Sequence, residues 1–437
     1  MNITFIGTGY VGLVSGVMLS YTGHNVTCLD TDSTKISQLK NNILPIYEPT
    51  LDEYLLQSVK AGKLHFTDSY DVELSKSQAV FITVGTPPLE TGEADLQYIF
   101  AAIDNICPWL HDDCLIVIKS TVPPTTCNQI IAYLREKNYP FHVASNPEFL
   151  REGKAVQDFL HPDRILIGTN NKHSEEILKQ IYFPLTSKGI ELINTDIITA
   201  ELAKYASNAF LATKVAFTNE IAELCEKIGA NVTDVALTVG SDKRIGRAFL
   251  NAGPGFGGSC FPKDLTALLA IARKYNSDST ILNSVINSNE QRPAKMVDKI
   301  TNIVGESLAK KNIAILGLTF KADTDDIRSS PAIKIMKILL DKGANITAFD
   351  PMGMVNTKNE LKHTGYKNLF FSDSGLSACQ NSDIILITTE WAEFKNLDWE
   401  LIRTYDPIII DFRNLLDLKQ IKALKLKYYC IGIKDEL

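Results

Sequence analysis

A cysteine inside a glycine-rich stretch is the residue of this sequence best suited to covalent chemistry. The stretch "GPGFGGSCFPKD" (253–264) places Cys260 directly before an apolar helical pattern that has Lys263 in its first turn. A helix N-terminus and a nearby ammonium group both lower the pKa of a thiol, and the thiolate is the nucleophilic form. Because its glycines carry no side chains, we expect the stretch to leave bare backbone against which a bulky ligand lies. We predict that Cys260 is reactive and that the other seven of the eight cysteines are buried structural residues.

Two other clusters supply the acids, bases and amide that such a nucleophile needs. The stretch "SNPEFLREG" (145–153) follows a strand pattern and offers Glu148 and Glu152. Lys204 and Asn208 stand four residues apart in a helical pattern, so they share one face of that helix. A solvated surface is the alternative interpretation of each pair. Together, an amine, an amide, carboxylates and a thiol form a complete set for acyl chemistry.

A glycine fingerprint near the N-terminus indicates dinucleotide binding. The stretch "ITFIGTGYVGLVSG" (3–16) has Gly7, Gly9 and Gly12 as G-x-G-x-x-G between a strand pattern and an apolar helical pattern, and Asp30 ends the next strand pattern. In this motif the glycines allow a tight turn, close approach to a pyrophosphate and close helix packing, and the helix N-terminus attracts the phosphates. An acid in the position of Asp30 binds a ribose hydroxyl, so we predict NAD as the cofactor, in preference to NADP.

The alternation of elements predicts how these residues are positioned. Over roughly the first 190 residues, short β-branched runs alternate with helical patterns, and the same alternation restarts at Lys311. Such alternation is typical of parallel sheets with crossover helices. The loops "VGTP" (84–87) and "KSTVPP" (119–124) follow apolar strand patterns, at the carboxyl edge where open α/β sheets bind ligands. Both are therefore candidate cofactor loops.

A single long helix is predicted between the two alternating regions. Residues 196–228 contain neither Gly nor Pro, Ala or Ser recurs at helical spacing, and Gly229 ends the pattern. We expect this helix to join two lobes and to supply a subunit contact through its small-residue face. The predicted fold is α/β, with two Rossmann-like open parallel-sheet domains joined by a long central helix. The predicted domains are 1–195 (NAD-binding), 196–305 (central helical and dimerisation region with the cysteine loop) and 306–437 (C-terminal α/β domain).

Composition excludes several classes of protein. The 437 residues carry a net charge of −7, which attracts neither nucleic acid nor an anionic membrane. The eight cysteines include no C-x-x-C pair, so they indicate neither a disulfide framework nor a zinc site. No apolar run approaches the roughly 20 residues that span a bilayer. We predict a cytoplasmic protein with a small-molecule substrate and no metal, in which local basic side chains and backbone N–H groups bind any phosphate.

The cysteine loop, together with "SNPEFLREGKAVQDFLHPDRILIG" (145–168), resembles the nucleotide-sugar 6-dehydrogenases, the UDP-glucose/GDP-mannose dehydrogenase family, over nearly the whole chain. The resemblance implies an NAD-dependent four-electron oxidation of UDP-glucose to UDP-glucuronate. In it, Cys260 carries a thiohemiacetal and then a thioester, and Glu148 serves thioester hydrolysis. Ser259 precedes the cysteine where enzymes for UDP-N-acetylmannosamine typically have His, which favours glucose.

The resemblance also implies a role for further residues, by their match to the family's motifs. The catalytic residues that it implies are Cys260, Lys204, Asp264, Glu148, Asn208 and Thr121. The NAD contacts that it implies are Gly7, Gly9, Tyr10, Val11, Gly12, Asp30, Lys35, Thr86, Thr121, Glu152 and Arg328. The sugar-nucleotide contacts that it implies are Glu148, Phe149, Leu150, Arg151, Glu152, Lys204, Asn208, Arg244, Phe249, Leu250, Phe256, Gly257, Phe320, Lys321 and Arg413. Arg244 matches an arginine that family dimers lend to the neighbouring subunit, so a homodimer or higher homo-oligomer is implied as well.

Other functions remain open on the sequence. A related enzyme acting on GDP-mannose or a UDP-N-acetylhexosamine shares most of the motifs. A two-electron dehydrogenase of the 6-phosphogluconate or hydroxyacyl type shares the architecture but needs no cysteine in a glycine-rich loop. A non-catalytic protein that binds NAD or a sugar nucleotide is a third alternative, but such a protein has no need for an acid, a base, an amide and a thiol in one set. The stretch "AILGLTFKADTDDIRSSP" (314–331) has no second G-x-G-x-x-G, so the C-terminal domain is predicted to bind UDP and not another dinucleotide.

Overall fold

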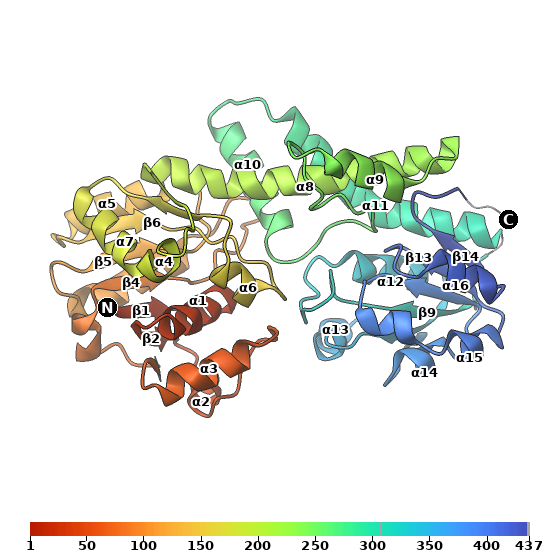
Figure 1. The fold of residues 1–437 in the computed structure, drawn as a ribbon, viewed down its shortest axis with the longest axis horizontal. Coiled ribbons are helices and arrows are strands. Elements are labelled where there is room, and N and C mark those ends of the chain that lie inside the picture. The colour runs from red at the N-terminus through yellow and green to blue at the C-terminus, as the bar shows by residue number, and fades with distance from the viewer. Residues whose placement is uncertain (306, 435–437) are drawn as a thin grey trace. The chain divides into compact units, whose positions relative to one another are not determined.

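The computed structural model describes residues 1–305 and 307–434, and the chain divides into two compact units. Unit 1 comprises residues 1–207 and 270–275, and unit 2 comprises residues 208–269 and the chain from residue 276 onward. Figure 1 shows that each unit contains one sheet with helices around it. The helix α8 (Ile197–Ile228) belongs to unit 1 at its start and to unit 2 from Asn208.

Unit 1 is built on an eight-stranded sheet with the order β3-β2-β1-β4-β5-β6-β7-β8. Its central strands are apolar and buried, as expected of strands covered on both faces. The strands are β1 (Asn2–Ile6), β2 (Asn25–Leu29), β3 (Leu64–Thr67), β4 (Ala79–Ile82), β5 (Leu115–Ile118), β6 (His142–Ser145), β7 (Ile165–Gly168) and β8 (Leu192–Thr195). The helices are α1 (Tyr10–Tyr21), α2 (Ser33–Lys40), α3 (Leu51–Lys60), α4 (Gln97–Ile106), α5 (Thr126–Glu136), α6 (Ala155–Leu160) and α7 (Lys172–Thr186), with 3-10 turns at Val72–Lys76 and Cys107–Trp109.

The first sheet differs in one detail from the predicted all-parallel arrangement. Strand β7 pairs antiparallel to β6, at Ser145 and Gly168, and β8 then runs parallel to β7. A parallel neighbour requires a crossover that carries the chain back along the sheet. The segment between β6 and β7 has only the short helix α6, which packs against α1. The chain therefore enters β7 in the reversed direction.

Unit 2 contains a six-stranded sheet with the order β11-β10-β9-β12-β13-β14, in which every neighbouring pair is parallel. The prediction of a second open α/β sheet is confirmed. The strands are β9 (Asn312–Leu316), β10 (Asn345–Phe349), β11 (Leu369–Phe371), β12 (Ile384–Ile387), β13 (Ile408–Asp411) and β14 (Lys427–Cys430). The remaining helices are α9 (Val232–Ser241), α10 (Phe261–Lys274), α11 (Thr280–Val304), α12 (Pro331–Asp341), α13 (Met354–Leu361), α14 (Gly375–Cys379), α15 (Trp399–Arg403) and α16 (Leu418–Ala423), with a 3-10 turn at Ala392–Asn396.

The long helix α8 matches its predicted bounds to within one residue, and it is uninterrupted in Figure 1. Gly229 comes directly after it with a φ of 83°, and its N–H donates to the carbonyl of Cys225, as at a left-handed helix end. Ala212 and Ala216 are buried in a cluster with Leu265, whereas Ala206 is exposed. The subunit contact through small residues of α8 stays a prediction.

The exposed face of α8 in unit 2 carries large apolar side chains. Phe210, Phe217 and Leu224 are 67%, 54% and 49% exposed, at a spacing of seven residues. Side chains at this spacing lie on one side of a helix. Within residues 1–305 and 307–434, no helix has the length and apolar character needed to cross a membrane.

Candidate active site

The glycine fingerprint of unit 1 forms a turn with room for a phosphate group. A Cβ on Gly12 would collide with the carbonyl oxygen of Gly7, so this position must be glycine for α1 to pack against the turn. A Cβ on Gly9 would meet no atom within 4 Å, so the backbone there faces open space. The helix α1 begins directly after Gly9, at Tyr10, with Val11 in its first turn. Backbone N–H groups and a helix N-terminus beside open space suit the pyrophosphate of a dinucleotide.

Asp30 is an ionised acceptor at the end of β2. Its Oδ2 atom accepts hydrogen bonds from the N–H and hydroxyl of Thr8, both at 2.7 Å, and pairs with Lys35 Nζ at 3.1 Å. Burial alone raises the pKa of Asp30, but the hydrogen bonds from Asp32, Thr8 and Lys35 outweigh it and lower that pKa. A carboxylate in this position fits a ribose hydroxyl and repels an added 2′-phosphate.

The two candidate cofactor loops meet at the carboxyl edge of the first sheet. The hydroxyl of Thr86, which lies after β4, donates to the carbonyl oxygen of Thr121, which lies after β5, at 2.9 Å. Thr86 is buried, and Thr121 is half-buried. The structure therefore brings together two predicted site residues from separate loops.

Glu148 and Lys204 form a buried ion pair in unit 1. Lys204 Nζ lies 3.0 Å from Glu148 Oε1, and each side chain is only 5% exposed. The N–H of Leu150 donates to the other carboxylate oxygen, and the ring of Phe149 lies 5.2 Å from Lys204 Nζ. A carboxylate and an amine held in contact away from water can exchange protons with a substrate and stabilise an oxyanion. The alternative of a solvated surface is thereby excluded for Glu148 and for Lys204.

A network that sequence reasoning missed ties the fingerprint helix to the loop after Glu148. The carboxylate of Glu48, 4% exposed, accepts hydrogen bonds from the N–H groups of Gly153 at 2.6 Å and Ala155 at 2.7 Å, and from the hydroxyl of Tyr10. Burial, reinforced by Glu48, raises the pKa of Tyr10. The stretch around Glu48 has no motif, so only its burial in the fold reveals it.

Cys260 differs from the other cysteines. It is half-buried and immediately precedes α10, and its carbonyl accepts the helical hydrogen bond from the Asp264 N–H at 2.8 Å. The other seven thiols are buried, which confirms their predicted structural role. Burial raises the pKa of Cys28 and of Cys379 to about 12, so these thiols stay protonated at neutral pH.

Asp264 receives two donors next to Cys260. The amide of Asn208 donates to its Oδ2 at 2.6 Å, and Lys263 Nζ lies 2.6 Å from its Oδ1. Asp264 is 1% exposed, so its carboxyl group is bonded to these two partners away from water. The predicted catalytic residues Cys260, Asn208 and Asp264 of unit 2 are thus grouped at the start of α10.

The glycines of the cysteine loop were predicted to leave bare backbone against which a ligand lies, but other protein atoms occupy that space. A Cβ on Gly257 would lie 2.5 Å from the carbonyl oxygen of Ser329, and one on Gly258 would lie 2.8 Å from the ring of Phe320. The Gly258 N–H also donates to the carbonyl oxygen of Arg328 at 2.8 Å. These glycines admit another segment of the same unit, residues 320–329, to the cysteine loop. The expectation was wrong because that segment lies far away in the sequence.

Several predicted sugar-nucleotide residues of unit 2 are close together in the structure. The guanidinium of Arg413 donates to the carbonyl of Phe320 at 2.7 Å, and Lys321 Nζ lies 5.5 Å from the Phe320 ring. The rings of Phe249 and Phe256 both pack on Phe261, with centroids 5.9 and 5.8 Å away. Leu250, the residue after Phe249, is buried.

All four predicted arginines are paired with nearby carboxylates, and Arg413 lies 3.0 Å from Glu390. Arg151 forms two side-chain hydrogen bonds to Asp158, and Arg328 forms two to Asp326. Arg244 is 89% exposed and pairs with Asp242. The structure does not group Arg244 with the other predicted residues of unit 2. Glu152 is half-buried in the loop after Glu148.

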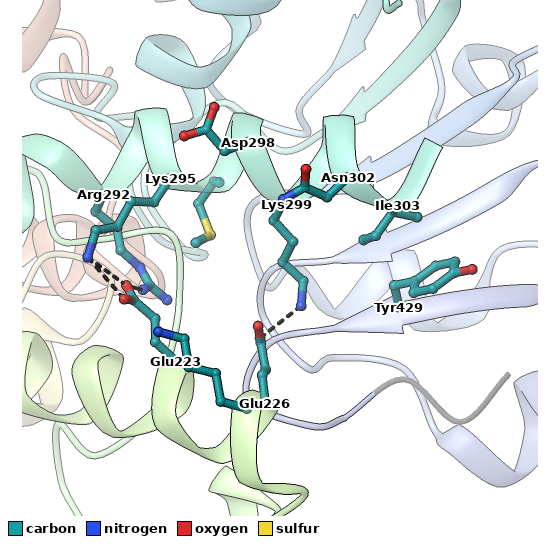
Figure 2. A pocket seen from close by; sticks show the side chains of 11 residues that line it. Glu223, Glu226, Arg292, Lys295, Asp298, Lys299, Asn302, Ile303 and Tyr429 are labelled. Carbon is teal, nitrogen blue, oxygen red and sulfur yellow. Dashed lines mark hydrogen bonds and ion pairs between the residues drawn. The ribbon is translucent and has the colours of Figure 1, made fainter. Parts of the chain in front are cut away.

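A cavity of about 660 Å³ in unit 2 is a different feature (Figure 2). None of the predicted site residues lines it. Figure 2 shows the carboxylates of Glu223 and Glu226 on α8 directed toward cations on α11. Glu223 pairs with Arg292 and Lys295, and Glu226 pairs with Lys299. The cavity is therefore separate from the candidate active site.

Comparisons with protein families cover most of the chain. The NAD binding domain of the UDP-glucose/GDP-mannose dehydrogenase family matches residues 1–186. The central domain of that family matches residues 198–291, and its UDP binding domain matches residues 314–418.

Individual proteins are similar over their whole length. A UDP-glucose 6-dehydrogenase from Rickettsia bellii is 59% identical, with 99% of this chain and 100% of that protein covered. A solved UDP-glucose dehydrogenase from Pyrobaculum islandicum has a TM-score of 0.90 and 34% identity, with 99% and 98% of the two chains covered. A UDP-D-ManNAc dehydrogenase from Pyrococcus horikoshii has a TM-score of 0.85 and 27% identity, with both chains covered completely.

Proposed function

Because the chain belongs to the UDP-glucose/GDP-mannose dehydrogenase family, we propose that it oxidises UDP-glucose to UDP-glucuronate with two NAD and one water. The observation that carries the proposal is Cys260, a half-buried thiol at the start of α10 beside the Asn208–Asp264–Lys263 group. A two-electron alcohol dehydrogenase needs no such thiol. Oxidation to the acid needs one, because a covalent adduct makes the aldehyde carbon a donor for the second oxidation.

The turn at Gly9 and the carboxylate of Asp30 fit NAD, with Lys35, Thr86 and Thr121 as further contacts. Bound NAD supplies the hydride acceptor for each of the two oxidations. The chain contributes open backbone for the pyrophosphate and an ionised acceptor for the ribose.

In the first oxidation, the primary hydroxyl of the sugar loses its proton through water to the carboxylate of Asp264. Asn208 and Lys263 hold that carboxylate in place, with bonds of 2.6 Å each. The ammonium of Lys204 stabilises the negative charge that develops on the sugar oxygen.

In the second oxidation, the thiolate of Cys260 adds to the aldehyde carbon and forms a thiohemiacetal. After that oxidation the sulfur holds the sugar as a thioester. Glu148 then accepts a proton from the attacking water, which Thr121 helps to hold, and the C–S bond breaks to release the carboxylic acid and the thiolate. The buried ion pair with Lys204 holds the Glu148 carboxylate in place for this role.

Counting the products tests the proposal. UDP-glucose should yield two NADH per sugar with no free aldehyde, and Cys260→Ser should bind UDP-glucose but retain less than about 1% of turnover. One NADH per sugar, or an active Cys260→Ser variant, would contradict it. A parallel assay with GDP-mannose and UDP-N-acetylmannosamine tests the hexose, for which Ser259 favours glucose.

The same proposal includes a homodimer that buries the exposed face of α8. Phe210, Phe217 and Leu224 form an apolar stripe that is exposed to solvent in a single chain. The same helix of a second chain would cover this stripe. Arg244, 89% exposed, is then available to the partner's substrate. Sedimentation should show a dimer, and Phe217→Glu should shift it toward the monomer. A monomer with full activity would contradict this assembly.

Location in the cytoplasm is supported by the cysteines. All eight are free thiols, and Cys114 and Cys379 are buried where burial raises the pKa of each to about 12. A reducing compartment suits a protein of this kind. Fractionation of the native source should find the protein with cytoplasmic enzymes.

A further inference from the structure

A second lysine is buried close to the Glu148–Lys204 pair, and the proposed reaction leaves it without a role. Lys119 comes directly after β5 and is 5% exposed. Its Nζ atom donates to Asn146 Oδ1 at 3.1 Å, and lies 3.5 Å from the hydroxyl of Tyr182. Both acceptors are neutral. Within residues 1–305 and 307–434, Lys119 forms no ion pair with a carboxylate.

Lys119 is linked to Glu148 through Asn146. The side-chain oxygen of Asn146 accepts hydrogen bonds from both Lys119 and Tyr182, and its amide group donates to the carbonyl of Leu166 at 2.8 Å. Asn146 is 1% exposed and stands two residues before Glu148 in the same loop. The Lys119 side chain therefore helps to fix the backbone that carries the catalytic carboxylate.

The charges around Glu148 are also unusual. Two buried ammonium groups, Lys119 and Lys204, act electrostatically on this one carboxylate, and Tyr182 is the other titratable group that faces Lys119. Burial lowers the pKa of Lys119 to about 8, with Glu148 raising it and Lys204 lowering it. Burial raises the pKa of Tyr182, so its hydroxyl stays neutral.

We propose that Lys119 is a positioning residue for the dehydrogenase reaction, whose ammonium group holds Asn146 and places a second buried positive charge near Glu148 and Lys204. Burying an ammonium group against neutral acceptors destabilises a fold, and an apolar side chain of similar length packs without that penalty. A charged group retained in such a place next to catalytic residues indicates a role in the chemistry. This inference rests on the proposed function.

The decisive experiment compares Lys119→Met with the wild-type enzyme between pH 6.5 and about 9.5. Methionine keeps the length and removes the charge and the donors. We expect kcat with UDP-glucose to fall about tenfold at pH 7, with KM changed less than about twofold, because the lost group acts on the reacting atoms through Glu148. The ratio of wild-type to variant kcat should then fall as the pH rises through about 8, where wild-type Lys119 loses its own charge. Lys137→Met is the matched control, because that lysine pairs with Asp104 on the surface of the same unit, and it should leave kcat and its pH profile unchanged.

A ratio that stays constant with pH would overturn the proposal, since a purely structural role does not titrate. So would unchanged kcat, or a raised KM with unchanged kcat. Lys119→Gln keeps a hydrogen-bond donor without charge, and it decides the matter if the Met variant fails to fold. Full activity of Lys119→Gln at pH 7 would contradict the need for the ammonium group.

A measurement without turnover separates this inference from the proposed function. Since the pKa of Lys119 is lower in the folded protein than in the unfolded chain, the folded wild type binds fewer protons between about pH 8 and 10.5. Wild-type Tm should therefore rise relative to Lys119→Met across that window. A constant Tm difference would contradict the lowered pKa of Lys119 and, with it, the change of the kcat ratio expected near pH 8. Absence of NADH formation by the wild type with UDP-glucose would refute the proposed function and leave this Tm test intact.

Discussion

The sheets of the two units begin with the same turn. Gly7 after β1 and Gly317 after β9 have φ values of 98° and 102°. In each sheet, a threonine after the neighbouring strand donates its hydroxyl to the carbonyl of that glycine: Thr83 to Gly7 at 2.8 Å, and Thr388 to Gly317 at 2.6 Å. In each, an aspartate directly after the next strand, Asp30 after β2 and Asp350 after β10, accepts an N–H from the turn.

The two turns differ in the length of chain between the glycine and the next helix. In unit 1 the helix α1 begins at Tyr10, whereas in unit 2 the helix α12 begins only at Pro331. Asp30 remains partly exposed, but Asp350 is fully buried and also accepts a hydrogen bond from the Trp391 indole at 3.1 Å. The second turn therefore has neither a helix N-terminus for a pyrophosphate nor an accessible acid for a ribose.

The added length in unit 2 supplies other residues. The segment between Gly317 and Pro331 carries Phe320, Lys321 and Arg328, and Phe320 packs on Gly258 of the cysteine loop. The same strand and turn thus serve different purposes in the two units, and the difference lies in the number of residues between the turn and the next helix. A short connection makes a dinucleotide site, and a long one supports a catalytic loop.

The largest effect that tests this comparison is expected for Asp350→Ala. Its carboxylate accepts the N–H groups of Leu318 at 2.7 Å and Thr319 at 3.1 Å, as well as the Trp391 indole. Removing it leaves these buried donors unsatisfied, so we expect a loss of about 3–5 kcal/mol of stability. Thermal unfolding measures this loss. A variant that keeps the wild-type Tm would show that the buried aspartate does not hold the second turn together.

Asp30→Ala is the matched change in unit 1, and it should affect binding more than folding. The carboxylate is near the surface, so we expect a Tm within about 3 °C of the wild type. Loss of the ribose acceptor should raise the Kd for NAD about tenfold or more, measured by fluorescence titration. A larger Tm loss than that of Asp350→Ala would reverse the distinction between the two turns.

The glycines of the two turns give a smaller effect. A Cβ on Gly317 would collide with Thr389, and its φ is unfavourable for other residues, so Gly317→Ala should destabilise by about 1–3 kcal/mol. A Cβ on Gly9 meets no protein atom, so Gly9→Ala should change stability by less than about 0.5 kcal/mol and weaken NAD binding alone. Urea unfolding and NAD titration of both variants separate these outcomes. Equal losses of stability would contradict the open space at Gly9.

The elements that were predicted correctly are those whose signal lies within a short stretch. Central strands such as β4 and β12 are continuous buried apolar runs, and α8 lacks Gly and Pro over its whole length. The strands β3, β8 and β11 lie at the edges of the two sheets and are only partly buried, so none of them is a continuous buried run like the central strands.

The candidate site divides in the same way. The fingerprint at Gly7 and the thiol of Cys260 are recognisable from neighbouring letters. Glu48 is not, because its partner Gly153 is 105 residues away, and the close approach of Phe320 to Gly258 is likewise set by the tertiary fold. The sequence places Lys119 only within a loop, since nothing in its sequence neighbours indicates its burial.

The smallest effect concerns Asp411 of the second sheet, a buried acid that is compared with Lys119, the buried base of the first sheet. β13 ends at Asp411, which accepts hydrogen bonds from the N–H groups of Arg413 at 2.9 Å and Leu415 at 2.7 Å. Burial raises the pKa of Asp411 despite these bonds, whereas burial lowers that of Lys119 at the end of β5. The folded protein therefore binds more protons at Asp411 than the unfolded chain does above pH 3.8, the usual pKa of an aspartate. Its contribution to stability is complete below that pH and declines as the pH rises through the folded pKa.

Against Asp411→Asn, the wild-type Tm should fall by a few degrees as the pH rises from about 4 to 7. A rise over that range would mean that the carboxylate is ionised in the folded protein, and the two sheets would then not differ in the sign of their response to pH.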